Sequence, residues 1–107
     1  MNATELEVGI ELDRLVAQAC GLLDRLYDGE LLLIDQNGTV NQFRPTVNAD
    51  DTLYAMDCLR KKNEGDIRIY FYENGKFEAI VDMGDIPHGI ADTFQLAVSR
   101  AIAQVKP

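Results

Sequence analysis

Three side chains suited to ligand binding alternate along one predicted strand. Arg68, Tyr70 and Tyr72 lie two residues apart, so an extended chain projects them from the same face. A guanidinium beside two aromatic rings can hold a phosphate and stack a base. The same row would equally suit a sheet face that packs under a helix. The spacing therefore predicts either a recognition surface or a covered face, and the sequence leaves both open.

The single histidine is the other candidate for chemistry. His88 lies in a segment rich in glycine and carboxylates, where it could bind a metal ion or act as a general base. The nearby carboxylates are Asp82, Asp85 and Asp92. Their spacing matches no metal-binding or catalytic motif, and a histidine beside a glycine is typical of a solvated turn.

Motifs for enzymatic chemistry are absent from the rest of the sequence. The chain contains no glycine-rich phosphate loop, no Ser-His-Asp order and no Cys-His cluster. We therefore predict no catalytic residue, no metal site and no cofactor, and we expect the protein not to be an enzyme. A cryptic enzyme is the alternative.

The charge of the chain limits its partners. The 18 acidic and 10 basic residues give a net charge of −8. Nucleic acid and anionic membranes both attract clustered Lys and Arg, so we expect neither as a direct partner. A carboxylate-covered surface can instead occupy a basic groove that normally holds DNA or RNA, or the charge can serve only to keep the protein in solution. The carboxylates predicted to form such a surface are Asp50, Asp51 and Asp57 on one helix, and Glu5, Glu7 and Glu11 on another.

Length and cysteine usage indicate a small intracellular domain. A chain of 107 residues fits one domain, spanning residues 1–107. No apolar run approaches the roughly 18 to 20 residues that cross a membrane, and the first residues lack the features of a secretory signal. We therefore expect a cytoplasmic location. Cys20 and Cys58 each fall within a predicted helix, and we expect both to be reduced, buried thiols.

A β-hairpin is the strongest predicted element and carries the Arg-Tyr-Tyr row. Segments 66–72 and 77–83 are rich in β-branched and aromatic residues and are joined by residues 73–75. A plain two-residue turn would mix apolar and charged side chains on each face. A three-residue loop with Gly75 in the left-handed conformation separates them. The residues then predicted to share the apolar face are Ile67, Ile69, Phe71, Phe77, Ala79 and Val81.

A glycine-bearing loop and an amphipathic helix are predicted to follow the hairpin. Asp92 is expected to cap this helix, with Gln95 as its capping-box partner. Apolar residues recur at the helical period from Phe94 to Val105, which predicts one face packed on the sheet. The residues expected to share one core are Phe71, Ala79, Val81, Leu96 and Ile102.

The N-terminal half is expected to begin with a helix and a second hairpin. The helix is predicted over 7–20, with Thr4 as its cap and Asp13 on its solvent side. A glycine ends it, although residues 22–27 could add a further helical turn. Segments 30–34 and 39–43 are β-like runs joined by a turn. The first of these is apolar along almost its whole length, which is typical of a central strand.

A second helix is predicted over residues 49–62, with Asn48 as its cap. Acidic residues lie in its first turn and basic residues in its last, and both placements are favourable against the helix dipole. Its predicted core stripe consists of Leu53, Met56 and Leu59, with Ala55 and Cys58 beside them.

Residues near both ends of the chain resemble a known family. Residues 10–17 read IELDRLVA and residues 91–101 read ADTFQLAVSRA. On these motifs the chain resembles the phage ABA-sandwich domain family, which consists of small phage and prophage proteins, and the resemblance covers most of the chain. Residues 28–43 and the helix start at 44–48 depart from the family pattern. The positions that match the family spacing are Asp92, Thr93, Leu96, Ala97, Arg100 and Ala101.

The resemblance implies an αβα layering and a viral origin, and it transfers no catalytic residue. We therefore expect an α+β fold, an αβα sandwich-like single domain in which three helices pack on a small, mainly antiparallel sheet. The expected function is binding: a small acidic phage-type protein that inhibits a host antiviral defence complex. Mimicry of the nucleic acid that such a complex binds is the expected mode of inhibition. A homodimer is expected through the apolar strand edge at residues 31–34.

Two alternative functions stay open on the sequence. The first is a sponge that sequesters a signalling nucleotide, for which Tyr70 and Tyr72 would stack the base. The candidate cations for its phosphate are Arg44, Arg68, Lys76 and Arg100. The second alternative is a structural or virion-associated phage module.

Overall fold

The computed structural model describes residues 6–22, 24–27, 30–34, 39–63, 66–82 and 86–105. These residues form the helices α1 (Ile10–Ala19), α2 (Ala49–Asn63) and α3 (Phe94–Ile102). The strands are β1 (Asp24–Tyr27), β2 (Glu30–Ile34), β3 (Val40–Gln42), β4 (Asp66–Phe71), β5 (Phe77–Asp82) and β6 (His88–Ala91). The predicted α+β fold with three helices and antiparallel strands is confirmed. Among the described helices, none has the length and apolar character needed to cross a membrane.

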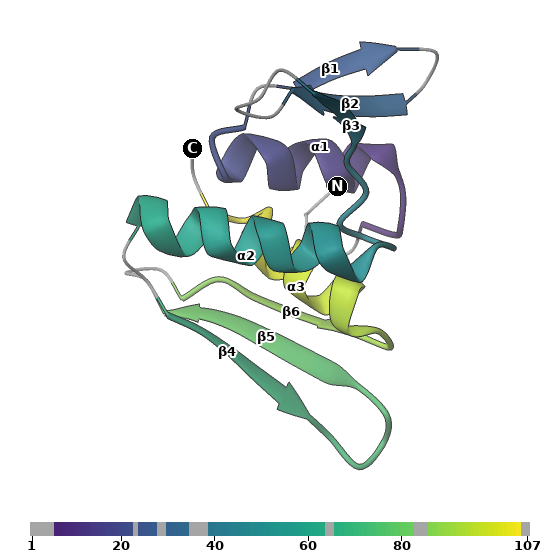
Figure 1. Ribbon diagram of the computed structural model, residues 1–107. Coiled ribbons are helices and arrows are strands. Elements are labelled where there is room, and N and C mark those ends of the chain that lie inside the picture. Colours follow the sequence, from purple (N-terminus) through teal and green to yellow (C-terminus); the bar gives the residue numbers. More distant parts are fainter. Residues whose placement is uncertain are drawn as a thin grey trace.

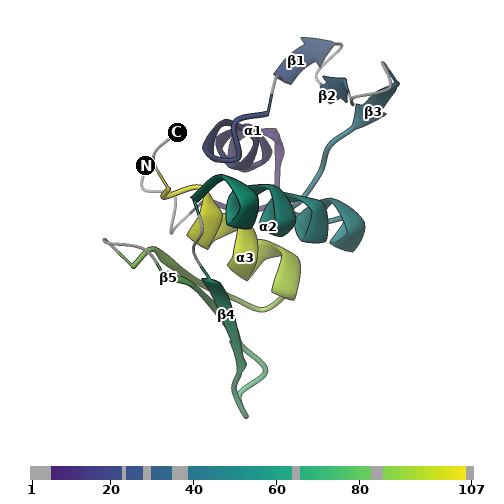
Figure 2. The ribbon, with the colours of Figure 1, turned by 60° about the vertical axis from the view of Figure 1, so that its left-hand side comes forward.

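The strands form two separate antiparallel sheets with the helices between them. The strand order is β1-β2-β3 in the first sheet and β4-β5-β6 in the second. The first sheet lies over α1, and the second lies beneath α2 and α3 (Figure 1). The same arrangement is visible after rotation (Figure 2). The first hairpin therefore does not join the sheet that carries the Arg-Tyr-Tyr row.

One cluster of buried apolar side chains connects the helices with both sheets. The first sheet contributes Leu31 and Leu33, while Ala79 and Val81 come from the second. The Cys20 thiol donates a hydrogen bond to a carbonyl of α2 at 3.3 Å. Both cysteines are free thiols, as predicted, although Cys58 is only half-buried. The helical residues in the cluster include Leu12 and Val16 from α1, Ala55 and Leu59 from α2, and Leu96, Ala97, Val98, Ala101 and Ile102 from α3.

The β4–β5 hairpin has the predicted register. Ile69 lies opposite Ala79, and Phe71 lies opposite Phe77. Gly75 has a φ of 84°, and the Tyr72 N–H donates to the carbonyl of residue 76 at 2.9 Å. This is the three-residue loop with a left-handed glycine. The predicted separation of an apolar face from a mixed face is therefore confirmed.

The segment predicted as a glycine-bearing loop contains strand β6. In this strand His88 lies opposite Ile80, and Gly89 lies opposite Ala79. A Cβ atom at Gly89 would lie 2.3 Å from the Ala97 carbonyl oxygen, so the strand passes α3 too closely for any side chain. The loop prediction is wrong for these residues because glycine also marks a close approach between backbones.

Residues 24–27 form β1 and not a further helical turn. Helix α1 starts at Ile10, later than predicted, and Thr4 lies outside the described residues. The chain then leaves the helix at Gly21, which has a φ of 71°. Strand β2 is central, as its apolar sequence predicts, and it pairs with β1 on one side and β3 on the other. The expected dimer contact through residues 31–34 is therefore wrong, because neither edge of β2 is available.

Two of the three predicted helix caps lie on described residues, and one of these two is confirmed. Asn48 caps α2, and its Oδ1 accepts the Asp51 N–H at 3.2 Å. Helix α3 is capped by Thr93, whose Oγ1 accepts the Leu96 N–H at 3.2 Å. Asp92, the predicted cap, pairs with a lysine. The cap of α3 is therefore one residue later than predicted. The sequence did not distinguish the two positions, because Asp and Thr are both favoured as caps.

Two residues predicted to be buried are exposed. Leu53 is 53% exposed, because the buried face of α2 is formed by Thr52, Ala55 and Leu59. Phe71 is 69% exposed near the hairpin tip, which extends past the helices (Figure 1). Its ring stacks on Phe77, with the ring centroids 4.6 Å apart. The other predicted core residues, Ala79, Val81, Leu96 and Ile102, are buried.

Candidate functional site

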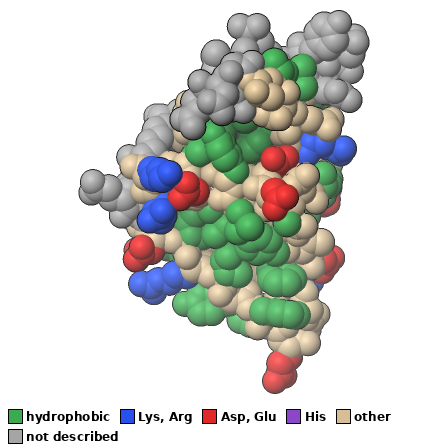
Figure 3. All heavy atoms as spheres, viewed as in Figure 1, with side chains coloured by type: hydrophobic (Ala, Val, Ile, Leu, Met, Phe, Trp, Pro, Cys, Tyr) green, Lys and Arg blue, Asp and Glu red, His purple; other side chains and the backbone are tan. Residues whose placement is uncertain are grey.

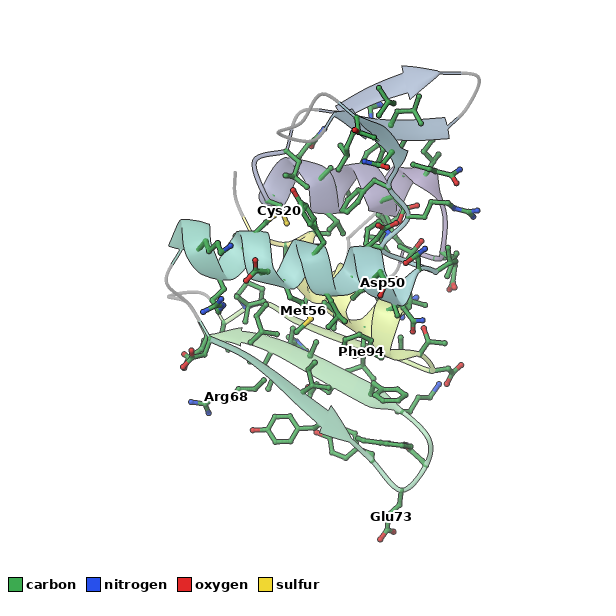
Figure 4. All side chains as sticks on the ribbon, in the orientation of Figure 1. Cys20, Asp50, Met56, Arg68, Glu73 and Phe94 are labelled. Carbon is green, nitrogen blue, oxygen red and sulfur yellow. The ribbon has the colours of Figure 1, made fainter. Side chains whose placement is uncertain are left out.

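One face of the β4–β5–β6 sheet is not covered by any described helix. Helices α2 and α3 lie on the same side of this sheet (Figure 1). The side chains of Arg68, Tyr70 and Tyr72 are exposed on the other side, and Arg68 projects away from α2 (Figure 4). The predicted row therefore belongs to an exposed surface and not to a packed layer. We call this surface the open face; it consists of Arg68, Tyr70, Tyr72, Glu78, Ile80, His88 and Ile90.

The strand register brings side chains from distant parts of the sequence together on the open face. Tyr70, Glu78 and Ile90 lie side by side across the three strands. Cross-strand neighbours have Cβ atoms roughly 4.5 to 5.5 Å apart, so these side chains are in contact range. Glu78 and Ile90 were not predicted as site residues. The hairpin register placed Glu78 beside Tyr70, but nothing in the sequence indicated that Ile90 is in a strand.

Glu78 lies at the centre of the open face. Its Oε1 accepts a hydrogen bond from the Tyr72 hydroxyl at 2.6 Å, and its Oε2 lies 3.5 Å from His88 Nδ1. The Glu78 side chain is 18% exposed. The pKa of Tyr72 is raised above the usual value for tyrosine, because its hydroxyl donates a hydrogen bond to this carboxylate. Near neutral pH Tyr72 therefore stays a donor, and its hydrogen bond orients the Glu78 side chain.

The histidine is placed differently from the prediction. His88 is exposed on β6 beside Glu78. Asp82 pairs with Arg68 and Asp92 pairs with Lys76, so neither forms a cluster with the histidine. Asp85 lies outside the described residues. Within the described part of the chain, no group of three His, Cys, Asp or Glu side chains is arranged to hold a metal ion.

Three of the four cations proposed for a nucleotide site already have ionic partners. Arg68 Nη2 lies 3.2 Å from Asp82 Oδ2, and Lys76 pairs with Asp92. Arg68 and Lys76 lie toward opposite ends of the β4–β5 hairpin. Arg100 donates to the Leu6 carbonyl at 2.9 Å and to the Ile90 carbonyl at 2.8 Å, and its Nη2 lies 3.4 Å from Glu7. These cations therefore do not converge on one pocket, and Arg100 fastens the N-terminal segment to β6.

The three predicted carboxylates of α2 have different surroundings. Asp51 Oδ2 accepts the Arg44 N–H at 2.9 Å and so closes the turn before the helix. Asp57 pairs with Arg60 at 2.9 Å and with Lys61 at 3.0 Å, and these bonds lower the pKa of Asp57.

Asp50 is exposed in the first turn of α2. On the face that contains α2, carboxylates are scattered around apolar side chains and do not form one patch (Figure 3). Of the carboxylates predicted on the first helix, Glu7 precedes α1 and pairs with Arg100, Glu11 is exposed, and Glu5 lies outside the described residues. Asp50 and Glu11 are therefore the predicted carboxylates most available to a partner.

Asp13 is buried, although the sequence pattern placed it on the solvent side of its helix. Its side chain is 2% exposed, and its Oδ1 accepts the Thr46 N–H at 3.0 Å. Burial raises the pKa of Asp13, while the Thr46 hydrogen bond and the nearby Arg44 oppose this increase. Asp13 thus connects α1 to the turn before α2, which is a structural role.

A shallow groove of about 500 Å³ lies between α2 and β4. Apolar side chains continue across this face from the helix to the sheet (Figure 3). Residues of both charge signs line the groove, so it does not favour a strongly charged small ligand. The groove is lined by Met56, Asp57, Arg60, Asp66, Ile67 and Arg68.

Comparison with known proteins assigns no family to this arrangement. No protein-family model matches the chain, and no curated protein matches it. The resemblance to the phage ABA-sandwich family therefore stays a prediction from the sequence motifs.

Proposed function

We propose that the protein acts by binding a basic site on another protein through its open face. The observation that carries this proposal is the position of Glu78, a carboxylate held by Tyr72 beside His88 at the centre of an uncovered sheet. A lysine or arginine side chain that approaches Glu78 meets a negative charge and the exposed ring of Tyr70. Aromatic and apolar side chains around a charge-assisted contact are typical of protein interfaces.

The proposed partner is a host protein whose basic site normally holds nucleic acid. A net charge of −8 would steer the protein toward such a site over long distances. Occupying the site would block nucleic-acid binding, so the protein would act in the host cytoplasm as an inhibitor of an antiviral defence complex. The charge, the open face and the resemblance to small phage proteins support this proposal.

Affinity capture from a bacterial host lysate, analysed by mass spectrometry, tests the proposal. Wild type should retain a basic, nucleic-acid-handling protein, and retention should weaken steeply between low salt and about 0.5 M salt. Glu78→Gln keeps an acceptor for Tyr72 but removes the charge, so it should lose the partner. Tyr54→Ala is the control: it removes an exposed tyrosine of α2 that lies outside the open face, so this variant should still retain the partner. Equal retention by Glu78→Gln would contradict the proposal.

Sequestration of a nucleotide is a second candidate, because Tyr70 and Tyr72 offer exposed rings in one row with Arg68. A phosphate would have to displace Asp82 from Arg68. Calorimetry with a panel of cyclic and linear nucleotides tests this candidate, and Arg68→Ala should abolish any binding observed. If no nucleotide binds more tightly than about 100 μM, the candidate should be dropped.

A further inference from the structure

The outer edge of β4 is unpaired among the described strands. The backbone bond from Tyr72 N–H to residue 76 fixes the alternation of the β4–β5 ladder, in which Arg68 and Tyr70 bond to β5. Ile67, Ile69 and Phe71 therefore direct their N–H and C=O groups away from β5. Strand β5 shows the same alternation. Val81, which lies opposite Ile67, donates its N–H to the Pro87 carbonyl at 2.8 Å and so does not bond to β4.

Exposed apolar side chains accompany this free edge. Ile69 is 39% exposed, and Phe71 is the most exposed of the large apolar residues described. Both project toward the helix side of the sheet, where Ile67 lines the groove between β4 and α2. An unpaired strand beside uncovered apolar surface is a template for the addition of another strand.

We propose that a second copy of the chain pairs with this edge, so that β4 runs antiparallel to the partner's β4 in a two-fold dimer. Side chains stay on the correct face only if the outward-facing residues oppose one another. With Ile69 opposite the partner's Ile69, Ile67 lies opposite the partner's Phe71. All three outward-facing residues then bond across the interface, giving about six backbone hydrogen bonds.

The side chains of β4 are complementary to themselves in this register. Arg68 lies opposite the partner's Tyr70, which permits a cation–π contact, and Asp66 lies opposite the partner's Tyr72. A shift by two residues in one direction would place Arg68 opposite the partner's Arg68. The opposite shift would pair Ile67 with the partner's Glu73, which lies in the hairpin loop. This complementarity identifies a second copy, and not an unrelated strand, as the occupant of the edge.

The same register covers apolar surface on both copies. Phe71 of each copy lies next to Ile67 of the other, at the groove between α2 and β4. The two β4–β5–β6 sheets become one continuous sheet, whose uncovered side joins both open faces. The dimer would form whatever the open face binds, so this inference is independent of the proposed function.

Light scattering or sedimentation up to about 500 μM tests the dimer. The mass of wild type should rise from 11.9 kDa toward twice that value. Ile69→Lys places a charge at the centre of the contact and should stay at 11.9 kDa at every concentration. Ile90→Lys is the matched control, because Ile90 is 46% exposed on strand β6 at the opposite edge of the sheet, and this variant should still dimerise.

Disulfide trapping tests the register in protein that carries Cys58→Ser. Ile69→Cys should form a cross-linked dimer under mild oxidation, because directly opposed residues in a bonded pair have Cα atoms about 5.5 Å apart. Ile67→Cys should not cross-link, since it faces the partner's Phe71. The proposal is overturned by a monomeric wild type, a dimeric Ile69→Lys, a monomeric Ile90→Lys or equal cross-linking from both cysteine variants.

Discussion

The two faces of the β4–β5–β6 sheet share one backbone but have different neighbours. On the helix side, Ala79 and Val81 are buried against α3, and β6 passes this helix so closely that Gly89 can carry no side chain. On the open face, Tyr70 and Glu78 occupy alternate positions of the same strands, and none of the helices that the structure describes lies above them. The comparison separates two roles: the covered face maintains the fold, and the open face is available to a partner.

Truncation of the core should have the largest effect on stability. Ile102 is fully buried, so Ile102→Ala should lower the free energy of unfolding by about 2 to 5 kcal/mol. Ile90→Ala on the open face should change it by only about 0.5 kcal/mol. Urea denaturation measures both. Similar losses from the two variants would show that the open face is covered in solution.

Gly89 in β6 and Gly75 in the hairpin loop should differ in how much their substitution destabilises the fold. Gly89→Ala forces a methyl group against the α3 backbone and should cost about 1 to 3 kcal/mol, with the larger value expected because backbone atoms cannot move aside easily. Gly75→Ala meets no neighbouring atom and should cost only about 1 kcal/mol, from its left-handed conformation. Thermal unfolding of both variants ranks them, and a larger loss for Gly75→Ala would contradict the close approach.

The pH dependence of stability should reveal the buried carboxyl group of Asp13. Because the pKa of Asp13 is raised, the folded state binds more protons than the unfolded state at pH values just above the usual aspartate pKa of 3.8. The stability that Asp13 contributes is therefore fully present below that value and is lost as the pH rises through the raised pKa. Asp13→Asn should remove this slope. Denaturation curves measured between about pH 3 and 7 decide this, and an unchanged slope in Asp13→Asn would assign the slope to another group.

Removing an aromatic ring from the open face should have the smallest effect on stability. Tyr70 is exposed, so Tyr70→Ala should leave the unfolding midpoint almost unchanged. The affinity of Tyr70→Ala for the captured partner should fall about tenfold or more, as for an aromatic contact at the centre of an interface. If this variant binds as tightly as wild type, Tyr70 is not part of the interface.

The sequence predicted the β4–β5 hairpin well because its signals are local. The alternation of side chains and the sequence at 73–75 together specify both the register and the left-handed Gly75. They also placed Tyr70 and Glu78 on one face. The hairpin sequence does not show which face of the sheet the helices cover. The structure was therefore needed to choose between a recognition surface and a packed layer.

The failures of prediction involve contacts between distant segments. Strand β6 was missed because Gly89 reads as a turn until α3 is known to lie against it. Asp13 follows a solvent-side pattern, yet the Thr46 N–H from a later turn holds it in the interior. Phe71 has the correct face but lies beyond the reach of the helices. Each outcome depends on tertiary packing, which periodicity along one segment does not contain.

The most direct test of the open face is an NMR titration of the labelled protein with a short arginine-rich peptide, used as a probe for a basic partner. If the open face binds basic side chains, the amide signals of Tyr70, Tyr72, Glu78, His88 and Ile90 should shift together, and the shifts should disappear in Glu78→Gln and at about 0.5 M salt. Shifts confined to the acidic residues of α1 and α2, with the β4–β5–β6 signals unchanged, would contradict binding at the open face.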